Sequence, residues 1–600
     1  MRELIYKPYL KEFKSPVGAA KVNEPFSISI GITETDDIES VYFVLTKEDE
    51  TPVYYRMENF GRKFSITLSV SSRGLYSYHF KVNQWGGGYF NIFCGEALKP
   101  EYHYGKDWLL LAVERKYPFP SLLKGGVIYQ IMVDRFYSVN RRKTRSDCVY
   151  RDDWGGTPEY KPDQKGIVRN NDFFGGNLKG VTAKLDYLSS LGVSCVYLNP
   201  IFKAYSNHKY DTGSYMNVDP DFGSEDDLKE LIVKAKKRGI SVMLDGVFSH
   251  TGDDSVYFNK YGKYDSLGAY QSKSSPYYDW YSFSAFPDKY SCWWGINILP
   301  QVDELNPTYL DFITGKGGVI EKYTSLGVSA WRLDVADELP DEFISRLCSA
   351  VKRVNPKALV LGEVWEDAVT KVAYGVRRKY FWGDELESVT NYPFKSDILH
   401  FAITGDGTRL AGAVNAIVDH YPKDVLDSLM NAIGTHDTVR AITALSSDAT
   451  PANKDDRAEK KISDYPLAVR RLRCAAALQF TLPGVPCIYY GDEAGMQGYE
   501  DPFNRRCFPW GKEDTSLTAF YARLGRIRRE NADVLAEGEY IPVAAGRGIF
   551  SFRRVSPVGS IFVVANRSEF PLSLDKKVYD LILERATAEV PPDSAVIIRE

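Results

Sequence analysis

The chain has few of the residues that mark metal-dependent, nucleic acid-binding or membrane proteins. Its 600 residues include only eight cysteines and seven histidines, with no Cys-x-x-Cys or His-x-His pair. A metal-dependent barrel hydrolase would need such a ligand cluster, so this class is disfavoured. A net charge of −4 without a basic run gives no support for nucleic acid binding, and no apolar run reaches transmembrane length. We therefore expect no nucleic acid and no membrane as a partner.

The cysteines and the first residues bear on the location of the protein. Cys195, Cys474 and Cys487 lie in apolar segments, where free buried thiols are more common than disulfides. Free thiols are typical of a reducing interior. The start, Met1-Arg-Glu-Leu-Ile-Tyr-Lys7, lacks the apolar core of a signal peptide. These features predict a cytoplasmic protein.

The pattern of the chain changes twice, as expected for a length that exceeds one hydrophobic core. Residues 1–120 show short alternating strands such as Phe26-Ser-Ile-Ser-Ile-Gly-Ile32, which predict an N-terminal β-sandwich. Residues 121–533 alternate strands with helices. Strands return in residues 534–600, which predict a small C-terminal β-sandwich.

The central region contains eight segments that are typical of buried strands. They are residues 126–133, 193–200, 240–250, 328–334, 358–363, 388–394, 429–437 and 485–493. Helical patterns separate them, and one begins with the capping-box pattern Ser224-Glu-Asp-Asp227 and ends before Gly239. Eight strand–helix units predict a (β/α)8 barrel, the TIM barrel. The long gap of residues 251–307 predicts a loop domain inserted after the third strand.

Acidic residues and histidines stand at the ends of four of these segments. They are Asp245 and His250 in the third, Asp334 in the fourth, Glu363 in the fifth, and His436 with Asp437 in the seventh. Polar residues at the C-terminal ends of barrel strands surround one mouth, where the chemistry of such barrels takes place. The sequence therefore predicts a ring of carboxylates and histidines at that mouth.

Two carboxyl groups that face one cleft can cleave a glycosidic bond. One attacks the anomeric carbon and the other protonates the leaving oxygen, and retention of configuration needs a separation of about 5–5.5 Å. Asp334 and Glu363 end adjacent strands, which can deliver this separation. Arg332 lies two residues before Asp334, on the same face of the strand, and can keep that carboxyl group ionised. The alternative for Arg332 and Asp334 is a structural ion pair.

Four short segments resemble the signature regions of the α-amylase superfamily, also called glycoside hydrolase family 13. They are Leu244-Asp-Gly-Val-Phe-Ser-His250, Trp331-Arg-Leu-Asp-Val-Ala-Asp-Glu338, Gly362-Glu-Val-Trp365 and Gly434-Thr-His-Asp437. The resemblance extends from about residue 125 to about residue 510 and implies the (β/α)8 barrel. The N-terminal sandwich, His208-Lys-Tyr-Asp-Thr212 and residues 334–338 resemble the branch of neopullulanases, cyclomaltodextrinases and maltogenic amylases.

This resemblance implies roles for residues at the mouth. Asp334 would be the nucleophile, Glu363 the general acid/base, and Asp437 the residue that stabilises the transition state. The other expected substrate-binding residues are Arg332, Asp245, His250, His436, His208, Tyr210, Asp211, Glu338 and Trp365. Tyr210 resembles the aromatic platform under the reacting sugar, and a tyrosine packed inward in its loop is the alternative.

Two further features concern outer sugar positions. Glu338 would face the leaving-group side of the cleft, with a solvated loop acid as the alternative. Trp293 and Trp294, in the long gap, can stack on glucose rings or pack the insertion against the barrel. The sequence alone does not separate these alternatives.

Two stretches resemble the N-terminal calcium loop of this branch but depart from its pattern. One follows Arg135 and includes Ser138 and Asn140, and the other is Phe174-Gly-Gly-Asn177. Asn177 stands where aspartate is usual, and Ser138 replaces a usual ligand type. Calcium favours several oxygen ligands with charge among them, so these three residues are weak candidates for a calcium site. No organic cofactor is expected.

The resemblance implies an enzyme that acts on α-glucan oligosaccharides. It would hydrolyse α-glucosidic bonds in maltodextrins or cyclodextrins with retention, through a covalent glycosyl-enzyme on Asp334, with transglycosylation when a sugar replaces water. An exo-α-glucosidase or an α-1,6-debranching enzyme is an alternative. A non-catalytic glycan-binding barrel is the alternative of a different class, and the presence of all three acids opposes it. The N-terminal sandwich would bind glucan or form a homodimer.

Overall fold

The computed structural model describes residues 3–95, 97–164 and 166–600, which form two compact units. The first unit consists of Met1–Pro118, Asp367–Glu385 and Gly412–Leu426. The second consists of Phe119–Glu366, Leu386–Ala411 and Asp427–Glu600. The barrel and the C-terminal strands belong to the second unit. The domain limits expected from the sequence stay predictions.

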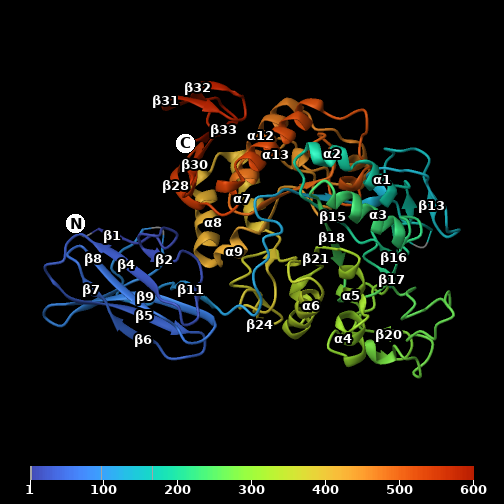
Figure 1. Cartoon of the computed structure of the whole chain (residues 1–600), viewed down its shortest axis with the longest axis horizontal. Helices are drawn as coiled ribbons and strands as arrows, with labels where there is room; N and C mark the ends of the chain where they lie inside the picture. Colours follow the sequence, from blue (N-terminus) through green and yellow to red (C-terminus); the bar gives the residue numbers. More distant parts are fainter. Residues whose placement is uncertain (1–2, 96, 165) are drawn as a thin grey trace. The chain divides into compact units, whose positions relative to one another are not determined.

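The second unit contains an eight-stranded parallel barrel, of which Figure 1 labels β15, β18 and β21. In sheet order the strands are β25 (Ser388–Val389), β22 (Leu359–Gly362), β21 (Ala330–Leu333), β18 (Ser241–Gly246), β15 (Cys195–Leu198), β12 (Ile128–Ile131), β27 (Val485–Tyr489) and β26 (Met430–Ala432). A parallel bridge between Thr390 and Met430 brings the two ends of this order together. The predicted (β/α)8 barrel is confirmed, although each strand is shorter than the segment that predicts it.

Apolar side chains fill the barrel and hold its strands in place. Every residue of β12, β15, β21, β22 and β27 is buried, as expected for parallel strands covered on both faces. One core cluster joins Ile128, Tyr197, Met243, Leu359 and Val485 from five different strands. Residues just beyond the C-terminal ends of these strands therefore have well-defined positions at the mouth.

Local sequence signals set the limits of the helices. In α3 (Glu225–Lys236) the predicted capping box is present: Ser224 Oγ accepts from the Asp227 N–H at 3.2 Å, and the Asp227 carboxylate accepts from the Ser224 N–H at 2.8 Å. Gly239 then takes a left-handed conformation with φ +70°. The other helices of the described residues are α1 (Leu178–Ala183), α2 (Leu185–Ser190), α4 (Pro307–Thr314), α5 (Val319–Ser325), α6 (Asp341–Val354), α7 (Tyr392–Thr404), α8 (Gly407–His420), α9 (Lys423–Leu426), α10 (Ala441–Ala444), α11 (Lys454–Glu459), α12 (Tyr465–Thr481), α13 (Thr515–Glu530) and α14 (Ala532–Leu535).

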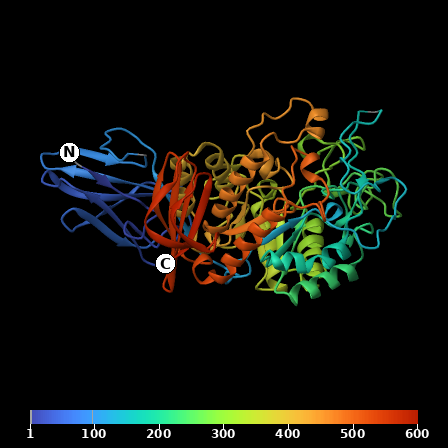
Figure 2. The same ribbon diagram turned by 90° about the horizontal axis from the view of Figure 1, so that it is seen from above.

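Two mostly antiparallel sheets form the body of the first unit, whose N-terminal strands are blue in Figure 2. One sheet contains β1 (Leu4–Ile5), β2 (Lys14–Ser15), β4 (Phe26–Ile32), β7 (Glu58–Asn59) and β8 (Lys63–Leu68). The other contains β3 (Ala20–Lys21), β5 (Ile38–Lys47), β6 (Val53–Arg56), β9 (Gly74–Gln84), β10 (Tyr89–Ile92) and β11 (Trp108–Val113). A single core cluster draws on both sheets, for example Ile28 of β4 and Phe80 of β9. Two sheets that share one core form the predicted β-sandwich.

Two distant segments complete the first unit. Residues 367–385 contribute the hairpin of β23 (Val372–Ala373) and β24 (Val376–Arg377). Residues 412–426 bring Asp419, whose carboxylate pairs with the buried ammonium group of Lys14. The Lys14 ammonium group also donates to the Asp419 carbonyl at 2.9 Å. This buried pair joins a strand of the sandwich to a segment about 400 residues later in the chain.

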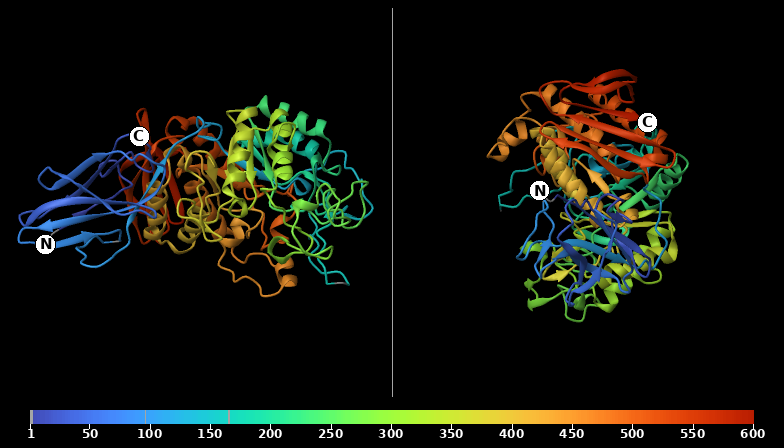
Figure 3. Two further views of the ribbon diagram at one scale, coloured as in Figure 1. Left: turned by 90° about the horizontal axis from the view of Figure 1, so that it is seen from below. Right: turned by 90° about the vertical axis from the view of Figure 1, so that its left-hand side faces the viewer.

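The C-terminal strands form a small two-sheet arrangement within the second unit, seen in red in the right-hand view of Figure 3. Four antiparallel strands make the larger sheet: β28 (Glu539–Gly546), β29 (Ile549–Ser556), β30 (Gly559–Asn566) and β33 (Ser594–Arg599). The smaller sheet pairs β31 (Leu572–Asp580) with β32 (Arg585–Val590). Val564, Val596 and Ile598 of the larger sheet share a core with Val590 and Leu572 of the smaller one.

The segment after the third barrel strand carries short elements only. They are the 3-10 helices η2 (Tyr278–Trp280) and η3 (Trp293–Gly295) and the hairpin of β19 (Phe283–Ala285) and β20 (Lys289–Tyr290). Antiparallel bridges from His250 to Gln301 and from Tyr281 to Val302 fasten the segment near the strand end. Its status as a separate inserted domain stays a prediction.

The loop after the second barrel strand carries the hairpin of β16 (Phe202–Ala204) and β17 (Thr212–Val218), with His208, Tyr210 and Asp211 between its strands. The other short elements are β13 (Val149–Tyr150), β14 (Asp172–Phe173), η1 (Val133–Arg135), η4 (Ala336–Glu338) and η5 (Phe503–Arg505). Within the part of the chain that the structure describes, no helix combines the length and apolarity needed to cross a membrane.

Candidate active site

Strands β18, β21 and β22 carry three acidic residues to one place at the barrel mouth. Asp245 is the last residue but one of β18, Asp334 directly follows β21, and Glu363 directly follows β22. All three side chains are buried. Arg332 lies within β21, opposite Asp245 in the register of the two strands. The structure therefore brings together four residues that the sequence places at strand ends.

The Arg332 guanidinium contacts all three carboxyl groups. Its Nη1 lies 2.7 Å from Asp245 Oδ1 and 2.6 Å from Asp334 Oδ1, and its Nη2 lies 2.8 Å from Glu363 Oε2. Burial raises the pKa of Asp334 and of Glu363 above their ordinary values, although Arg332 acts in the opposite direction. One buried positive charge faces three carboxyl groups, and this imbalance favours protonation within the cluster.

A strained peptide links the two acids. Val335 follows Asp334 and has φ +42° and ψ +57°, a left-handed conformation that is unfavourable for a β-branched residue. In this conformation its N–H donates to Glu363 Oε2 at 3.0 Å. The next N–H, of Ala336, donates to the Glu363 carbonyl at 3.2 Å. The turn into η4 thus holds Glu363 through both its side chain and its backbone.

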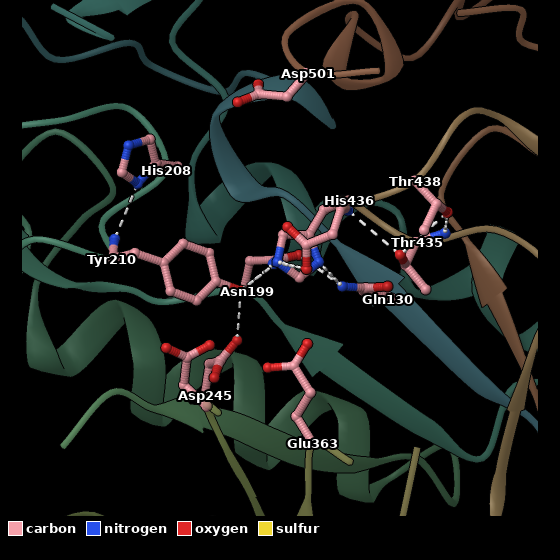
Figure 4. A network of polar contacts seen from close by, with 12 residues as sticks. Gln130, Asn199, His208, Tyr210, Asp245, Glu363, Thr435, His436, Thr438 and Asp501 are labelled. Atoms are coloured by element: carbon pink, nitrogen blue, oxygen red, sulfur yellow. Dashed lines mark hydrogen bonds and ion pairs between the residues drawn. The ribbon is translucent and has the colours of Figure 1, made fainter. Parts of the chain in front are cut away.

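Tyr210 and His436 form a stacked pair beside the acids, as Figure 4 shows. Their ring centroids are 5.2 Å apart and the ring planes differ by 3°. Tyr210 Oη lies 2.6 Å from His436 Nε2 and donates to Asp245 Oδ2 at 2.9 Å. Tyr210 is therefore joined to the acid cluster and is not packed away inside its own loop.

The three histidines of the site are neutral at physiological pH. Burial lowers the pKa of His436 well below its ordinary value, and it lowers those of His250 to about 4 and His208 to about 3. The Gln130 amide nitrogen lies 2.8 Å from His436 Nδ1, which assigns the ring proton to Nε2. That Nε2 faces Asp437 Oδ2 at 3.1 Å. A neutral ring with this tautomer can donate to a carboxylate or to a sugar hydroxyl.

Asp437 differs from the other acids in its exposure. Its side chain is 32% exposed, whereas those of Asp334 and Glu363 are 8% and 5% exposed. Arg505 Nη2 lies 3.4 Å from Asp437 Oδ1, and Arg505 Nε donates to the His436 carbonyl at 2.9 Å. Asp437 is therefore held at the mouth with a surface that a bound molecule can reach.

Several polar residues of the site were not predicted from the sequence. Tyr197 donates to Asp245 Oδ2 at 2.6 Å, and the Asn199 amide donates to Tyr210 Oη at 2.9 Å. Both residues, like Gln130, lie in or directly after predicted strands, so their strand-end positions could have indicated them. Arg505 lies in η5, after the last barrel strand, and no local pattern indicates it.

The remaining predicted residues lie around this centre. His208 Nδ1 lies 3.0 Å from Ser206 Oγ and 3.1 Å from the Tyr210 nitrogen, and Asp211 accepts from the Ser206 N–H at 3.0 Å, so both residues shape the Tyr210 loop. His250 Nε2 lies 3.0 Å from the Tyr210 carbonyl oxygen.

Trp365 and Glu338 lie on either side of the boundary of the acid cluster. Trp365 stacks on Tyr392 with ring centroids 4.0 Å apart and remains 46% exposed. Glu338 Oε1 accepts from the indole N–H of Trp294 at 2.6 Å. Burial raises the pKa of Glu363, and a hydrogen bond with the Trp365 side chain acts against this rise, so Trp365 borders the acid cluster. Glu338 lies in the surroundings of the cluster.

The loop that resembles a calcium site contains an internal cation. Arg141 Nη1 donates to Asp152 Oδ1 at 2.8 Å, and its Nη2 donates to the Phe173 carbonyl at 2.9 Å. The same side chain passes so close to Gly175 that a Cβ there would lie 2.5 Å from Arg141 Nε. A guanidinium at this place opposes a second cation.

The predicted calcium ligands are engaged elsewhere or carry no charge. Asn177 caps α1, since its Oδ1 accepts from the Gly180 N–H at 2.8 Å and its Nδ2 donates to the Val139 carbonyl at 2.7 Å. Ser138 and Asn140 add only neutral oxygens. Among residues 3–95, 97–164 and 166–600, no group of three acidic, histidine or cysteine side chains is arranged to hold a metal. The donor set does not fit calcium.

Fold and site together define the class of the protein. A (β/α)8 barrel with paired carboxyl groups around an arginine at its mouth is typical of barrel glycoside hydrolases. The chain belongs to the α-amylase family, because the family model "Alpha amylase, catalytic domain" matches residues 130–533. The resemblance of the four signature segments is thereby confirmed.

Curated relatives cover most of this chain. The amylopullulanase of Thermoanaerobacter thermohydrosulfuricus is 34% identical over 658 residues, which cover 98% of this chain and 42% of that protein. The cyclomaltodextrinase of Thermoanaerobacter pseudethanolicus is 31% identical over 543 residues, which cover 88% of this chain and 83% of that protein. The chain spans less than half the length of the amylopullulanases that it matches.

Solved structures show the same fold. A cyclomaltodextrinase structure has a TM-score of 0.68 and 26% identity, and the match covers 100% of this chain and 97% of that one. The type III pullulan hydrolase of Thermococcus kodakarensis has a TM-score of 0.68 and 25% identity, with full coverage of both chains.

Proposed function

We propose that the protein is a retaining α-glucan hydrolase in which Asp334 is the nucleophile and Glu363 the general acid/base. The observation that carries this proposal is the contact of one guanidinium, that of Arg332, with both carboxyl groups in a buried site. Retention needs one ionised and one protonated carboxyl group close together. A pair of acids that shares one proton meets this need.

The hydrogen bonds suggest which oxygen of each acid reacts. Arg332 engages Asp334 Oδ1, which leaves Oδ2 to attack the anomeric carbon. Glu363 Oε2 contacts Arg332 and accepts the Val335 N–H, which leaves Oε1 to carry the proton. In the first step Oδ2 forms a bond to the anomeric carbon while Glu363 transfers its proton to the departing sugar oxygen. In the second step Glu363 takes a proton from water, and the water oxygen displaces Asp334.

The neighbouring residues would stabilise the charge that develops on the reacting sugar. Asp437 is the acid that a sugar hydroxyl can reach, and His436 Nε2 lies 3.1 Å from its Oδ2. The His250 Nε2–H donates to the Tyr210 carbonyl and so supports the Tyr210 loop. Tyr210 presents an aromatic ring to the same site. We assign these residues to substrate binding, together with Arg332, Asp245, Trp365 and the outer residue Glu338.

The relatives indicate the substrate class. Proteins named cyclomaltodextrinase, maltogenic amylase and amylopullulanase match this chain, which supports maltodextrins, cyclodextrins and pullulan-derived oligosaccharides as substrates. Transglycosylation would follow when a sugar replaces water in the second step. An α-1,6-debranching activity is a second candidate, and the amylopullulanase and pullulan hydrolase names favour it.

We further propose a cytoplasmic location and a homodimer formed through the N-terminal sandwich. All eight cysteines are free, and one relative is an intracellular maltogenic amylase of Bacillus subtilis, which supports the location. Sedimentation of the purified protein tests the dimer. The Arg141 guanidinium supports a hydrolase that works without calcium, and no organic cofactor is required by the proposed steps.

A product profile tests the proposed function. The purified protein is incubated with β-cyclodextrin, pullulan, maltotriose and soluble starch, with and without a chelator, and the sugars are separated by chromatography. Fast opening of β-cyclodextrin with slow attack on starch would support the proposal. Maltotriose from pullulan would favour α-1,6 debranching, and glucose as the sole product would favour an exo-α-glucosidase. No product from any substrate would favour a glycan-binding barrel, and loss of activity with the chelator would contradict calcium independence.

A further inference from the structure

Two adjacent tryptophans of the segment after the third barrel strand form an exposed aromatic stack. The rings of Trp293 and Trp294 have centroids 5.6 Å apart and planes that differ by 28°. Trp294 is 76% exposed, which is unusual for so large an apolar side chain. Its backbone is left-handed, with φ +50° and ψ +30°. An exposed aromatic ring on a strained backbone suggests a functional constraint.

The stack reaches from one barrel strand end to another. On one side, the Trp293 ring lies 5.4 Å from the ring of His250, which follows β18. On the other side, the Trp294 indole N–H donates to Glu338 Oε1 at 2.6 Å, and Glu338 ends η4 after β21. The two tryptophans therefore bridge the mouth between the residues that follow β18 and those that follow β21.

The contacts of η4 show which side of the cleft this bridge borders. The same turn that ends at Glu338 begins at Val335, whose N–H binds Glu363 Oε2 at 3.0 Å. The Glu338 N–H in turn donates to the Val335 carbonyl at 2.9 Å. In the proposed function Glu363 protonates the departing sugar, so the departing sugar lies on the Glu363 side. Trp294 is fastened to the residues that line this side.

We propose that Trp294 determines specificity on the leaving-group side: its ring is the stacking surface for the departing sugar, and its hydrogen bond with Glu338 holds the ring there. The proposal rests on the proposed function. The sugar that enters in transglycosylation occupies the same place as the departing one, because the second step reverses the first. Trp294 therefore favours a sugar over water as the acceptor.

Stacking explains why an indole suits this place. One face of a glucose ring is lined by C–H groups, and an aromatic face packs against such a surface while leaving the hydroxyl groups to water. The left-handed backbone and the bond to Glu338 fix the ring before the sugar arrives, which lowers the ordering cost of binding. The same two features would be without purpose for a tryptophan that merely packs the insertion against the barrel, since Trp294 is mostly exposed.

A substrate without a sugar as leaving group separates this role from catalysis. Hydrolysis of α-maltosyl fluoride releases fluoride, so it needs no sugar on the Glu363 side. With added glucose, the same donor reports the ratio of transfer product to maltose. For Trp294→Ala we expect fluoride release within about twofold of the wild type and a transfer ratio lower by about tenfold, the scale of one lost aromatic contact. Trp294→Phe, which keeps a ring and loses the N–H, should lower the ratio by about threefold.

The matched control is Phe570→Ala. Phe570 is also a largely exposed aromatic residue, at 73%, but it lies between β30 and β31 of the C-terminal strands, so this change should leave both readings unaltered. An unchanged transfer ratio in both Trp294 variants would overturn the proposal. So would a parallel loss of fluoride release and transfer in Trp294→Phe, because that pattern indicates a structural role. If the wild type releases no fluoride, the proposed function itself fails, which is a different result from a wild type that is active with unaffected variants.

Discussion

Two buried arginines of the barrel face aspartates in different ways. Arg135 lies in η1 after β12, and Arg332 lies within β21. Both are almost inaccessible, and both contact more than one carboxyl group. A list of ion pairs would not tell them apart. The other hydrogen bonds that their partners make distinguish the two arginines.

Around Arg135 the polar groups are saturated. Arg135 donates to Asp134 at 2.8 Å and to the carbonyls of Asp172 and Arg505 at 3.1 Å each. The Asp134 carboxylate also accepts the N–H groups of Phe174 and Gly175, both at 2.9 Å. With the lone pairs of Asp134 occupied by three donors, this cluster holds three chain segments together.

Around Arg332 the groups are unsaturated. The Arg332 Nε has no hydrogen-bond partner among the described residues, and three carboxyl groups share a single cation. Such a cluster is costly as a stabilising element but suits a site where charge must change during a reaction. In this pair, the arginine whose partners are fully hydrogen-bonded holds chain segments together, and the arginine that is shared by three carboxyl groups lies in the site of the proposed chemistry.

Asp334→Asn should have the largest effect, and it tests whether the Arg332 cluster supports chemistry. We expect kcat on maltotriose to fall by at least about a thousandfold, because the proposed nucleophile is lost. Thermal stability should be kept or increase, because one buried negative charge disappears from an overcrowded site. Turnover and thermal unfolding of the same preparation check both parts. Turnover near that of the wild type would move the nucleophile elsewhere.

Glu363→Gln should have the next largest effect and depend on the leaving group. On maltotriose we expect a loss of about 100- to 10,000-fold, the range of general acid catalysis. On α-maltosyl fluoride the first step needs little protonation, so its loss should be smaller. Burst and steady-state fluoride release measure this difference. Equal losses on both substrates would argue against the acid role.

Asp134→Asn should lower the stability of the protein and leave its activity largely unchanged. Its three neighbours are all donors, the N–H groups of Phe174 and Gly175 and the Arg135 Nε, so the new amide NH2 would face them without an acceptor. We expect a loss of about 2–4 kcal/mol in stability, seen as faster thermal inactivation. The kcat of the folded fraction should stay within about threefold. A stable variant without activity would contradict the structural role of this cluster.

The smallest expected effect is a change in the pH profile, which tests the proposed proton on Glu363. Burial raises the pKa of Glu363, so the acid stays protonated at a higher pH than a free glutamic acid would. Activity on maltotriose should therefore be lost only as the pH rises through this raised value, by about tenfold per pH unit beyond it. The alkaline limb should be flatter with α-maltosyl fluoride. Identical limbs for both substrates would assign the limb to another group.

The sequence predicts the barrel well because its signal is local. Strands buried on both faces are continuous apolar segments, and eight of them recur between helical patterns. The predicted segments are too long because the polar residues that follow each strand resemble strand residues. The assignment of residues 367–385 and 412–426 to the first unit has no local signal, because it depends on contacts such as Lys14 with Asp419.

In the candidate site too, contacts with a local sequence signal can be predicted, and contacts that depend on the tertiary fold cannot. Asp245, Asp334 and Glu363 stand at strand ends, so their meeting follows from barrel geometry. The contact of Arg505 with Asp437 joins residues 68 positions apart through a loop whose course the sequence does not specify. The bond from Trp294 to Glu338 likewise depends on how an irregular segment folds back over the mouth.

The left-handed Val335 sets a limit on how the protein tolerates heat. Its conformation costs about 1–3 kcal/mol, and the surrounding barrel must supply that energy. As the barrel softens on warming, relaxation of this peptide would release its strain, and its N–H would then turn away from Glu363. The fine spacing of the two acids should therefore be lost while the strands are still formed. An enzyme built in this way would stop working at a lower temperature than the one at which it unfolds.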